Sequence, residues 1–389
     1  MNLCLPYASI YMLALGLNDS QVGLIATIAM LSQVVFAFLS GPITDKMGRR
    51  NATAFFDFIA WCIPCIIWWY ATNFWFFFVA ALINGIMMIP TNAWDCLLIE
   101  DAEKNQIAKI NSLVIIFGQL SVLFAPISAI LFSQLTLVPA IRILYINAFI
   151  VMTLKVVLLY IFSRETGMGM IRREESRGKS IFSLAAGYGG VLKIIGKSRG
   201  TIFALIVTAI VGIVGMINTT FWPVIVSRKL LVPDYLLPMF PVFRSLVAIA
   251  FLVFVAPFLT GAALKLPLLT GFLCYFIGQI ILILAPVEGP VKYIMLFVAL
   301  IFDGLGLGSL MMLARTLVAL NVNPEERARV QAILHMIVMA VTSPFGWIAG
   351  ILSGFSRNFP FVLTLSLLAF GFIITLLHYM SVSKKPSLT

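Results

Sequence analysis

Three ionisable side chains stand inside long apolar stretches of the sequence. Arg244 lies ten residues after Asp234, about 15 Å along a helix, and Asp303 lies eleven residues after Lys292, at a similar depth. His335 lies about four residues inside a third stretch, and imidazole titrates near neutral pH. At the centre of a bilayer an ionised group costs at least about 2.5–3.5 kcal/mol, so each needs a reason. Arg244 and Asp303 form either a solute or proton site or a structural ion pair, and His335 is a proton carrier or a structural histidine.

The composition indicates that these stretches cross a membrane. The chain has 389 residues, of which 61% are hydrophobic and 11% charged, and its mean hydropathy is +1.07. Soluble domains are about 45–50% apolar and about 25% charged. A spanning helix needs about 20 apolar residues, and the sequence has twelve such stretches. They lie near 3–17, 22–43, 53–71, 74–94, 108–133, 139–162, 201–226, 235–259, 266–286, 292–320, 330–354 and 359–382.

The basic residues predict the orientation in the membrane. With the N-terminus inside, 18 of the 26 lysines and arginines fall in inner gaps, four in outer gaps and four within spans. Inner loops carry the excess of Lys and Arg, so both termini are expected in the cytoplasm. The net charge of +11 lies in short gaps between apolar stretches. We therefore expect the lipid bilayer as a partner and no nucleic acid, and we expect the plasma membrane, as in a bacterial or archaeal inner membrane.

A polar segment divides the chain into two sets of six stretches. We expect an N-terminal bundle at 1–163, a cytoplasmic linker at 164–200 and a C-terminal bundle at 201–389. The fifth and eleventh stretches each follow an acidic-then-basic gap and carry one proline in mid-run, Pro126 and Pro344. Parallel six-span repeats are an architecture of transporters.

The gap between the second and third stretches reads GPITDKMGRR, from Gly41 to Arg50. Gly41 allows close helix packing, Gly48 allows a tight turn, and Arg49 and Arg50 hold the turn at the cytoplasmic side. Asp45 can face a helix N-terminus or a basic side chain from the other half. The segment resembles the signature of the major facilitator superfamily, G-x-L-a-D-r-x-G-r-r, in sequence and in position.

The resemblance implies an all-α fold of twelve transmembrane helices in two six-helix bundles. It also implies secondary transport of a small organic solute by alternating access, for which we expect coupling to protons. In that fold the motif forms an inner gate, which Asp95 and Arg315 are expected to join. Arg244, Asp303 and His335 are then the candidate solute or proton site. The resemblance names no solute, and we expect the protein to work as a monomer.

The alternatives are an intramembrane enzyme and a non-transporting receptor or scaffold. A metalloprotease would need an HExxH motif, but the two histidines are 43 residues apart. An intramembrane aspartyl protease needs its aspartate after Gly-x-Gly, whereas Asp303 precedes its glycines, and no G-x-S-x-G is present. Cys62 and Cys65 form a CxxC within an apolar stretch, which we interpret as two small residues of a membrane helix. We expect no catalytic residues, no metal and no cofactor.

Overall fold

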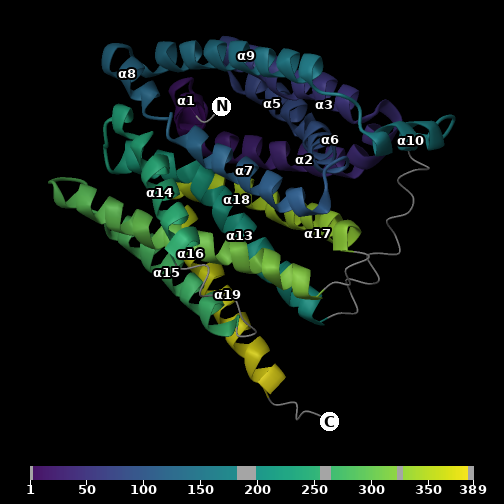
Figure 1. The fold of residues 1–389 in the computed structure, drawn as a ribbon. Helices are drawn as coiled ribbons and strands as arrows, with labels where there is room; N and C mark the ends of the chain where they lie inside the picture. Colours follow the sequence, from purple (N-terminus) through teal and green to yellow (C-terminus); the bar gives the residue numbers. More distant parts are fainter. Residues whose placement is uncertain (1–2, 182–198, 255–263, 322–326, 384–389) are drawn as a thin grey trace. The chain divides into compact units, whose positions relative to one another are not determined.

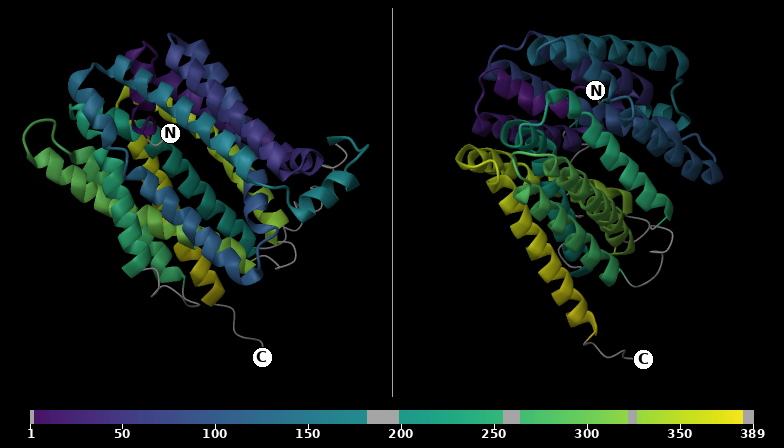
Figure 2. Two further views of the ribbon diagram at one scale, coloured as in Figure 1. Left: turned by 45° about the horizontal axis from the view of Figure 1, so that its top comes forward. Right: turned by 90° about the vertical axis from the view of Figure 1, so that its left-hand side faces the viewer.

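The computed structural model describes residues 3–181, 199–254, 264–321 and 327–383. In these parts of the chain every regular element is a helix (Figures 1 and 2). The chain forms two compact units, Met1–Gly190 and Val191–Thr389, called unit 1 and unit 2 below.

Unit 1 contains the helices α1 to α10. Its long runs are often interrupted by a turn of 3₁₀ or π geometry rather than by a loop. The elements are η1 (Leu5–Tyr7), α1 (Ala8–Ala14), α2 (Asp19–Met47), α3 (Arg49–Asp57), η2 (Phe58–Cys62), α4 (Ile63–Tyr70), α5 (Phe74–Asn84), η3 (Gly85–Met87), α6 (Met88–Ile99), α7 (Lys104–Val122), α8 (Ile127–Gln134), α9 (Leu137–Phe162) and α10 (Gly167–Glu175).

Side chains in the short polar gaps start the next helix. The Asn18 side chain accepts from the backbone N–H of Gln21 (2.8 Å), and the Gln21 side chain accepts from that of Asn18 (3.0 Å). This capping box satisfies two backbone donors that the first turn of α2 leaves open. Asn73 caps α5 in the same sense, by accepting from the backbone N–H of Trp75. The gaps therefore end one helix and begin the next within a few residues.

Unit 2 is built around α13, and 56% of the most apolar segment of the helical run that α13 begins is buried. This helix packs against α16, α17, α18 and α19. The elements of the unit are α13 (Arg199–Val224), η5 (Ile225–Lys229), η6 (Asp234–Leu236), α14 (Met239–Phe254), α15 (Lys265–Leu284), α16 (Val291–Asn321), α17 (Arg327–Thr342), α18 (Pro344–Phe355) and α19 (Phe359–Ser383).

Glycines bring α15 and α16 close together. A side chain at Gly271 would meet Ser309 and Leu310, one at Gly278 would overlap Asp303, and one at Gly306 would overlap Tyr275. Small residues at such contacts let membrane helices approach until their backbones nearly touch. The close approach places polar side chains of the two helices next to each other.

Ten of the helical runs in the described residues are long and apolar enough to cross a membrane. Two further apolar runs are shorter, Leu5–Ala14 and Ile116–Phe132. The all-α membrane fold is therefore confirmed, while the full set of twelve spans stays a prediction. The prolines of the fifth and eleventh stretches both mark helix breaks, since α7 ends four residues before Pro126 and α18 begins at Pro344.

Candidate functional site

The motif between α2 and α3 forms a turn that depends on one glycine. Gly48 has φ +85° and ψ 157°, a combination that is essentially restricted to glycine. Its backbone N–H donates to the carbonyl of Thr44 at the end of α2, and α3 begins directly after it at Arg49. The turn therefore reverses the chain with no loop residue other than Gly48.

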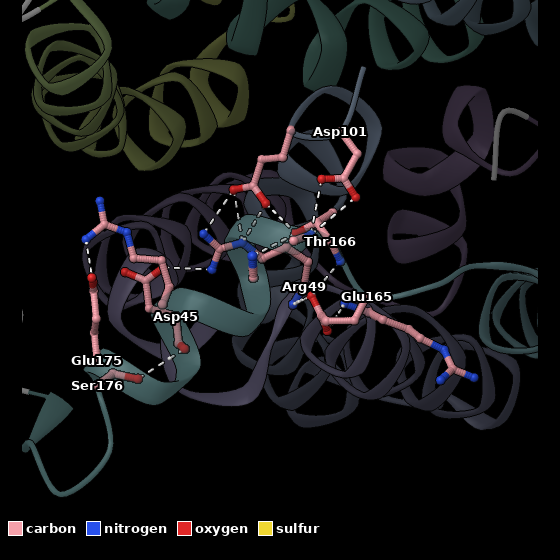
Figure 3. A network of polar contacts seen from close by, with 12 residues as sticks. Asp45, Arg49, Asp101, Glu165, Thr166, Glu175 and Ser176 are labelled. Atoms are coloured by element: carbon pink, nitrogen blue, oxygen red, sulfur yellow. Dashed lines mark hydrogen bonds and ion pairs between the residues drawn. The ribbon is translucent and has the colours of Figure 1, made fainter. Parts of the chain in front are cut away.

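Arg49 is the centre of a charge network (Figure 3). Its side chain is only 6% exposed, and Nη1 lies 2.7 Å from Oδ1 of Asp45. Nη2 donates to Oε1 of Glu100 at 3.0 Å, and Nε donates to both oxygens of that carboxylate at 3.1 and 3.2 Å. Charge-assisted bonds of this kind are about twice as strong as neutral ones. The network ties the end of α2, the start of α3 and the end of α6 together.

Glu165, after α9, binds the start of α3 from the other side. Its carboxylate accepts from the backbone N–H groups of Arg49 (2.8 Å) and Arg50 (3.1 Å), which are open donors at a helix N-terminus. A negative charge is also favourable there because of the helix dipole. Side chains at Gly48 or Gly169 would collide with this carboxylate. Gly48 thus provides both the turn and the space that Glu165 occupies.

The segment after Glu165 continues the network. Thr166 Oγ1 donates to Oε2 of Glu100 at 2.5 Å, and the backbone N–H of Gly167 donates to Asp101 at 3.1 Å. Ser176, after α10, donates to the backbone carbonyl of Asp45 at 3.1 Å. Figure 3 shows Asp45, Asp101, Glu165, Thr166 and Ser176 near Arg49. The start of the expected linker therefore belongs to unit 1 and packs on the motif.

The other residues expected at the gate, Gly41, Asp95 and Arg315, form no described contact with the network around Arg49. Gly41 lies within α2, seven residues before the turn at Gly48. Asp95 is exposed on α6, and no described residue pairs with it. The side chain of Arg315, on α16, is not among those that the structure describes. The roles of Asp95 and Arg315 stay predictions. Sequence reasoning missed Glu100, although an acidic residue just beyond the predicted 74–94 span was a usable signal.

Unit 2 holds a second polar group, buried between α13, α15 and α16. Asp303 is 1% exposed, and its Oδ1 accepts from Nε2 of Gln279 at 2.9 Å. Gln279 also donates to Oδ1 of Asn218 at 3.3 Å, and both amides are at most 1% exposed. The other oxygen of Asp303, Oδ2, is buried without a hydrogen-bond partner in the described residues. A buried carboxylate thus retains one open acceptor inside a membrane-spanning helix.

Arg244 acts on this group through its charge. The guanidinium lies on α14 and interacts electrostatically with the Asp303 carboxylate and with the hydroxyl of Tyr275, which is fully buried. No ion pair within 4.0 Å joins Arg244 to Asp303 in the described residues. His335 is exposed on α17. The hydrogen bond that Asp303 accepts comes from Gln279 and not from His335. Gln279 was not predicted because a neutral amide in an apolar stretch carries no charge that would mark it.

The two units define a class of protein: a multi-pass α-helical membrane protein with a charge network at a helix turn and a carboxylate buried in a span. The profile of the Major Facilitator Superfamily matches residues 1–333. The chain belongs to the Major Facilitator Superfamily, and the protein is a membrane transporter. The resemblance seen in GPITDKMGRR is thereby confirmed.

Solved structures show the same fold. A mutant of the nucleoside transporter NupG has a TM-score of 0.76 and 15% sequence identity, with 98% of this chain and 95% of that chain covered. A peptide transporter POT in complex with sulfate has a TM-score of 0.72 and 11% identity, with coverages of 98% and 91%. The human organic anion transporter MFSD10 has a TM-score of 0.60 and 14% identity, with coverages of 91% and 83%. A comparison of the sequence with curated proteins gives no match.

Proposed function

We propose that this transporter is a secondary active transporter that moves a small organic solute by alternating access, driven by protons. The observation that carries the proposal is Asp303, a fully buried carboxylate with one open oxygen in a membrane-spanning helix. Such residues are expensive in a membrane and mark ion or solute paths. Protonation of Asp303 would neutralise the carboxylate that accepts from Gln279 and would change its interaction with the charge of Arg244. This pair supports a proton-dependent switch.

Two further observations support the solute class and the two-state mechanism. Proteins of the same fold include a nucleoside transporter, a peptide transporter and an organic anion transporter, which favours an organic solute here. The network around Arg49 offers a set of contacts that can form in one state and open in another. A transport cycle needs such an element, whose equilibrium the solute and the proton bias.

The test is uptake into proteoliposomes with and without an inward proton gradient, using labelled nucleosides, dipeptides and organic anions as probes. We expect Asp303→Asn to lose gradient-driven accumulation while downhill exchange survives, because the proton carrier is gone and the path is not. Glu288→Gln, which changes an exposed carboxylate in the same unit, is the control and should transport normally. Full gradient-driven accumulation by the double variant Arg244→Gln, Asp303→Asn would contradict the proposal.

The orientation is part of the same proposal. Both termini and residues 164–200 lie in the cytoplasm, the membrane is the inner membrane of a bacterium or archaeon, and a monomer is the working unit with no nucleic acid bound. In a background without native cysteines, Arg177→Cys should react with an impermeant maleimide only from the cytoplasmic side. Tyr235→Cys should react only from outside; both positions are exposed. Labelling of both from one side would rule out this topology.

A further inference from the structure

A groove of about 620 Å³ runs along the surface of unit 1 between α3 and α9. Its apolar part is lined by side chains of both helices, with Phe55 and Val157 exposed by 56 and 46%. At the other end lie Asn51, in the first turn of α3, and Tyr160. Asn51 and Phe55 are one turn apart, about 6 Å along the axis. The groove is therefore polar at the turn that carries the motif and apolar below it.

The polar end carries basic side chains that form no ion pair within the described part of the chain, since the nearby carboxylate of Glu165 is bound to the backbone of Arg49 and Arg50. The guanidinium of Arg50 donates to the carbonyl of Tyr160 and lies 4.2 Å from the centre of the Tyr160 ring. Lys46, whose ammonium group donates to the carbonyl of Lys179, precedes the groove residue Met47, and Arg164 follows Ile161 by three residues. None of Arg50, Lys46 and Arg164 forms an ion pair with a carboxylate in the described residues.

The Asn51 amide adds hydrogen-bonding capacity at the same place. It lines the groove and forms no hydrogen bond with any residue that the structure describes. An amide offers two donors and one acceptor. The groove thus presents cations and an amide at its upper end and an apolar channel below, which is the chemical pattern of a phospholipid with a negative headgroup.

We propose that this groove binds an anionic phospholipid of the cytoplasmic leaflet. The phosphate lies at Arg50 and Asn51, and one acyl chain follows Phe55, Val156 and Val157. The charge of the upper end selects an anionic lipid over a zwitterionic one, since each basic residue near an anionic surface contributes about fivefold in affinity. The bound lipid joins the start of α3 to the end of α9, next to the turn at Gly48. The inference depends neither on the solute nor on proton coupling.

The test is native mass spectrometry of the full-length protein in detergent, titrated with dioleoyl phosphatidylglycerol or with dioleoyl phosphatidylcholine. We expect the first phosphatidylglycerol to bind more tightly than phosphatidylcholine. Arg50→Gln should weaken phosphatidylglycerol by about fivefold and leave phosphatidylcholine unchanged. Arg172→Gln is the matched control, because it removes an exposed arginine that already pairs with Glu175 on α10.

A second variant tests the groove itself. Val157→Trp fills the apolar part and should abolish the tight phosphatidylglycerol adduct. Val151→Trp is the control on the same helix, at a position that is 55% exposed and does not line the groove. Equal affinity for the two lipids, or unchanged binding in Val157→Trp, would overturn the proposal. So would a concentration-dependent dimer that Val157→Trp abolishes, because a second copy of the chain would then occupy the groove.

Discussion

Replacing Glu100 by glutamine should destabilise unit 1 far more than replacing Asp45 by asparagine, although both carboxylates bind Arg49. The Glu100 side chain is 16% exposed and takes three of the hydrogen bonds of the guanidinium. The Asp45 side chain is 37% exposed and takes one. Breaking one partner of a buried pair costs about 3–5 kcal/mol, and the lower end applies to Glu100 because some water reaches it. For Asp45, solvent screening leaves about 1 kcal/mol.

The assay uses the thiols of unit 1 as reporters. Cys4, Cys62 and Cys65 are buried there, and Cys96 is half-buried. In a Cys274→Ser background all remaining thiols belong to this unit, so a thiol-reactive fluorogenic dye follows its unfolding on heating. For a unit of this size about 1 kcal/mol corresponds to about 2–4 °C in melting temperature. The expected losses are therefore about 6–12 °C for Glu100→Gln and about 2–4 °C for Asp45→Asn.

Two further variants decide how the result is interpreted. Glu175→Gln removes a carboxylate from a pair in which both side chains are 54% exposed, and it should shift the melting temperature little. The double variant Arg49→Gln, Glu100→Gln should lose less than the sum of its single variants, because no buried charge is left unpaired. Equal melting of Glu100→Gln and Asp45→Asn, or strict additivity in the double variant, would refute the reasoning.

Two glycine substitutions test the close contacts. Gly48→Ala should destabilise unit 1 by about 1–3 kcal/mol in the same thiol assay. Alanine rarely adopts this backbone conformation, and its Cβ would displace Glu165. An unchanged melting temperature would contradict the described turn. Gly278→Ala should reduce transport without preventing membrane insertion, because the new methyl group would overlap Asp303 and the backbone of Ala299. Its control is Gly354→Ala, where the Cβ meets nothing within 4 Å.

The sequence predicts the helical fold well because a membrane imposes it. In a bilayer every backbone N–H and C=O group must be hydrogen-bonded within the helix. The length of an apolar stretch therefore predicts where a membrane-spanning helix lies. The breaks near Pro126 and at Pro344 follow from proline chemistry alone. The first stretch, near 3–17, is the shortest of the twelve, and its helical run in the structure covers only Leu5–Ala14.

Partners across helices could be predicted only in part. Asp45 and Arg49 are four residues apart, a spacing that favours an ion pair. Glu100 lies just beyond the predicted 74–94 span, and Asp95 was chosen from the same helix. Five residues correspond to about 500° of rotation, so the two acids point in different directions and only Glu100 meets Arg49. The spacing gives the angle between the two acids, but only the packing of the helices decides which of them faces Arg49.

The same limit applies in the membrane. Lys155 lies within the predicted 139–162 stretch, and its ammonium group lies 2.5 Å from the carboxylate of Asp57 on α3, a partner that the sequence alone does not indicate. Asp303 accepts a hydrogen bond from a neutral amide, Gln279, whose position in the sequence does not indicate this partner. The polar side chains inside the apolar stretches can be found from the sequence, but the packing of the helices decides which of them contact each other.

The attachment of Glu165, Thr166 and Ser176 to the motif determines where this protein can be divided. A break directly after α9 would remove the carboxylate that binds the start of α3 and the hydroxyl that binds Glu100. A break after Ile181 would keep those bonds and also the one from Lys46 Nζ to the carbonyl of Lys179. Two co-expressed fragments that meet after Ile181 should therefore assemble into a working protein, whereas fragments that meet at Ser163 should leave the first with an unsupported turn. The segment between the units is, for its first part, an extension of the N-terminal fragment and not a freely replaceable tether.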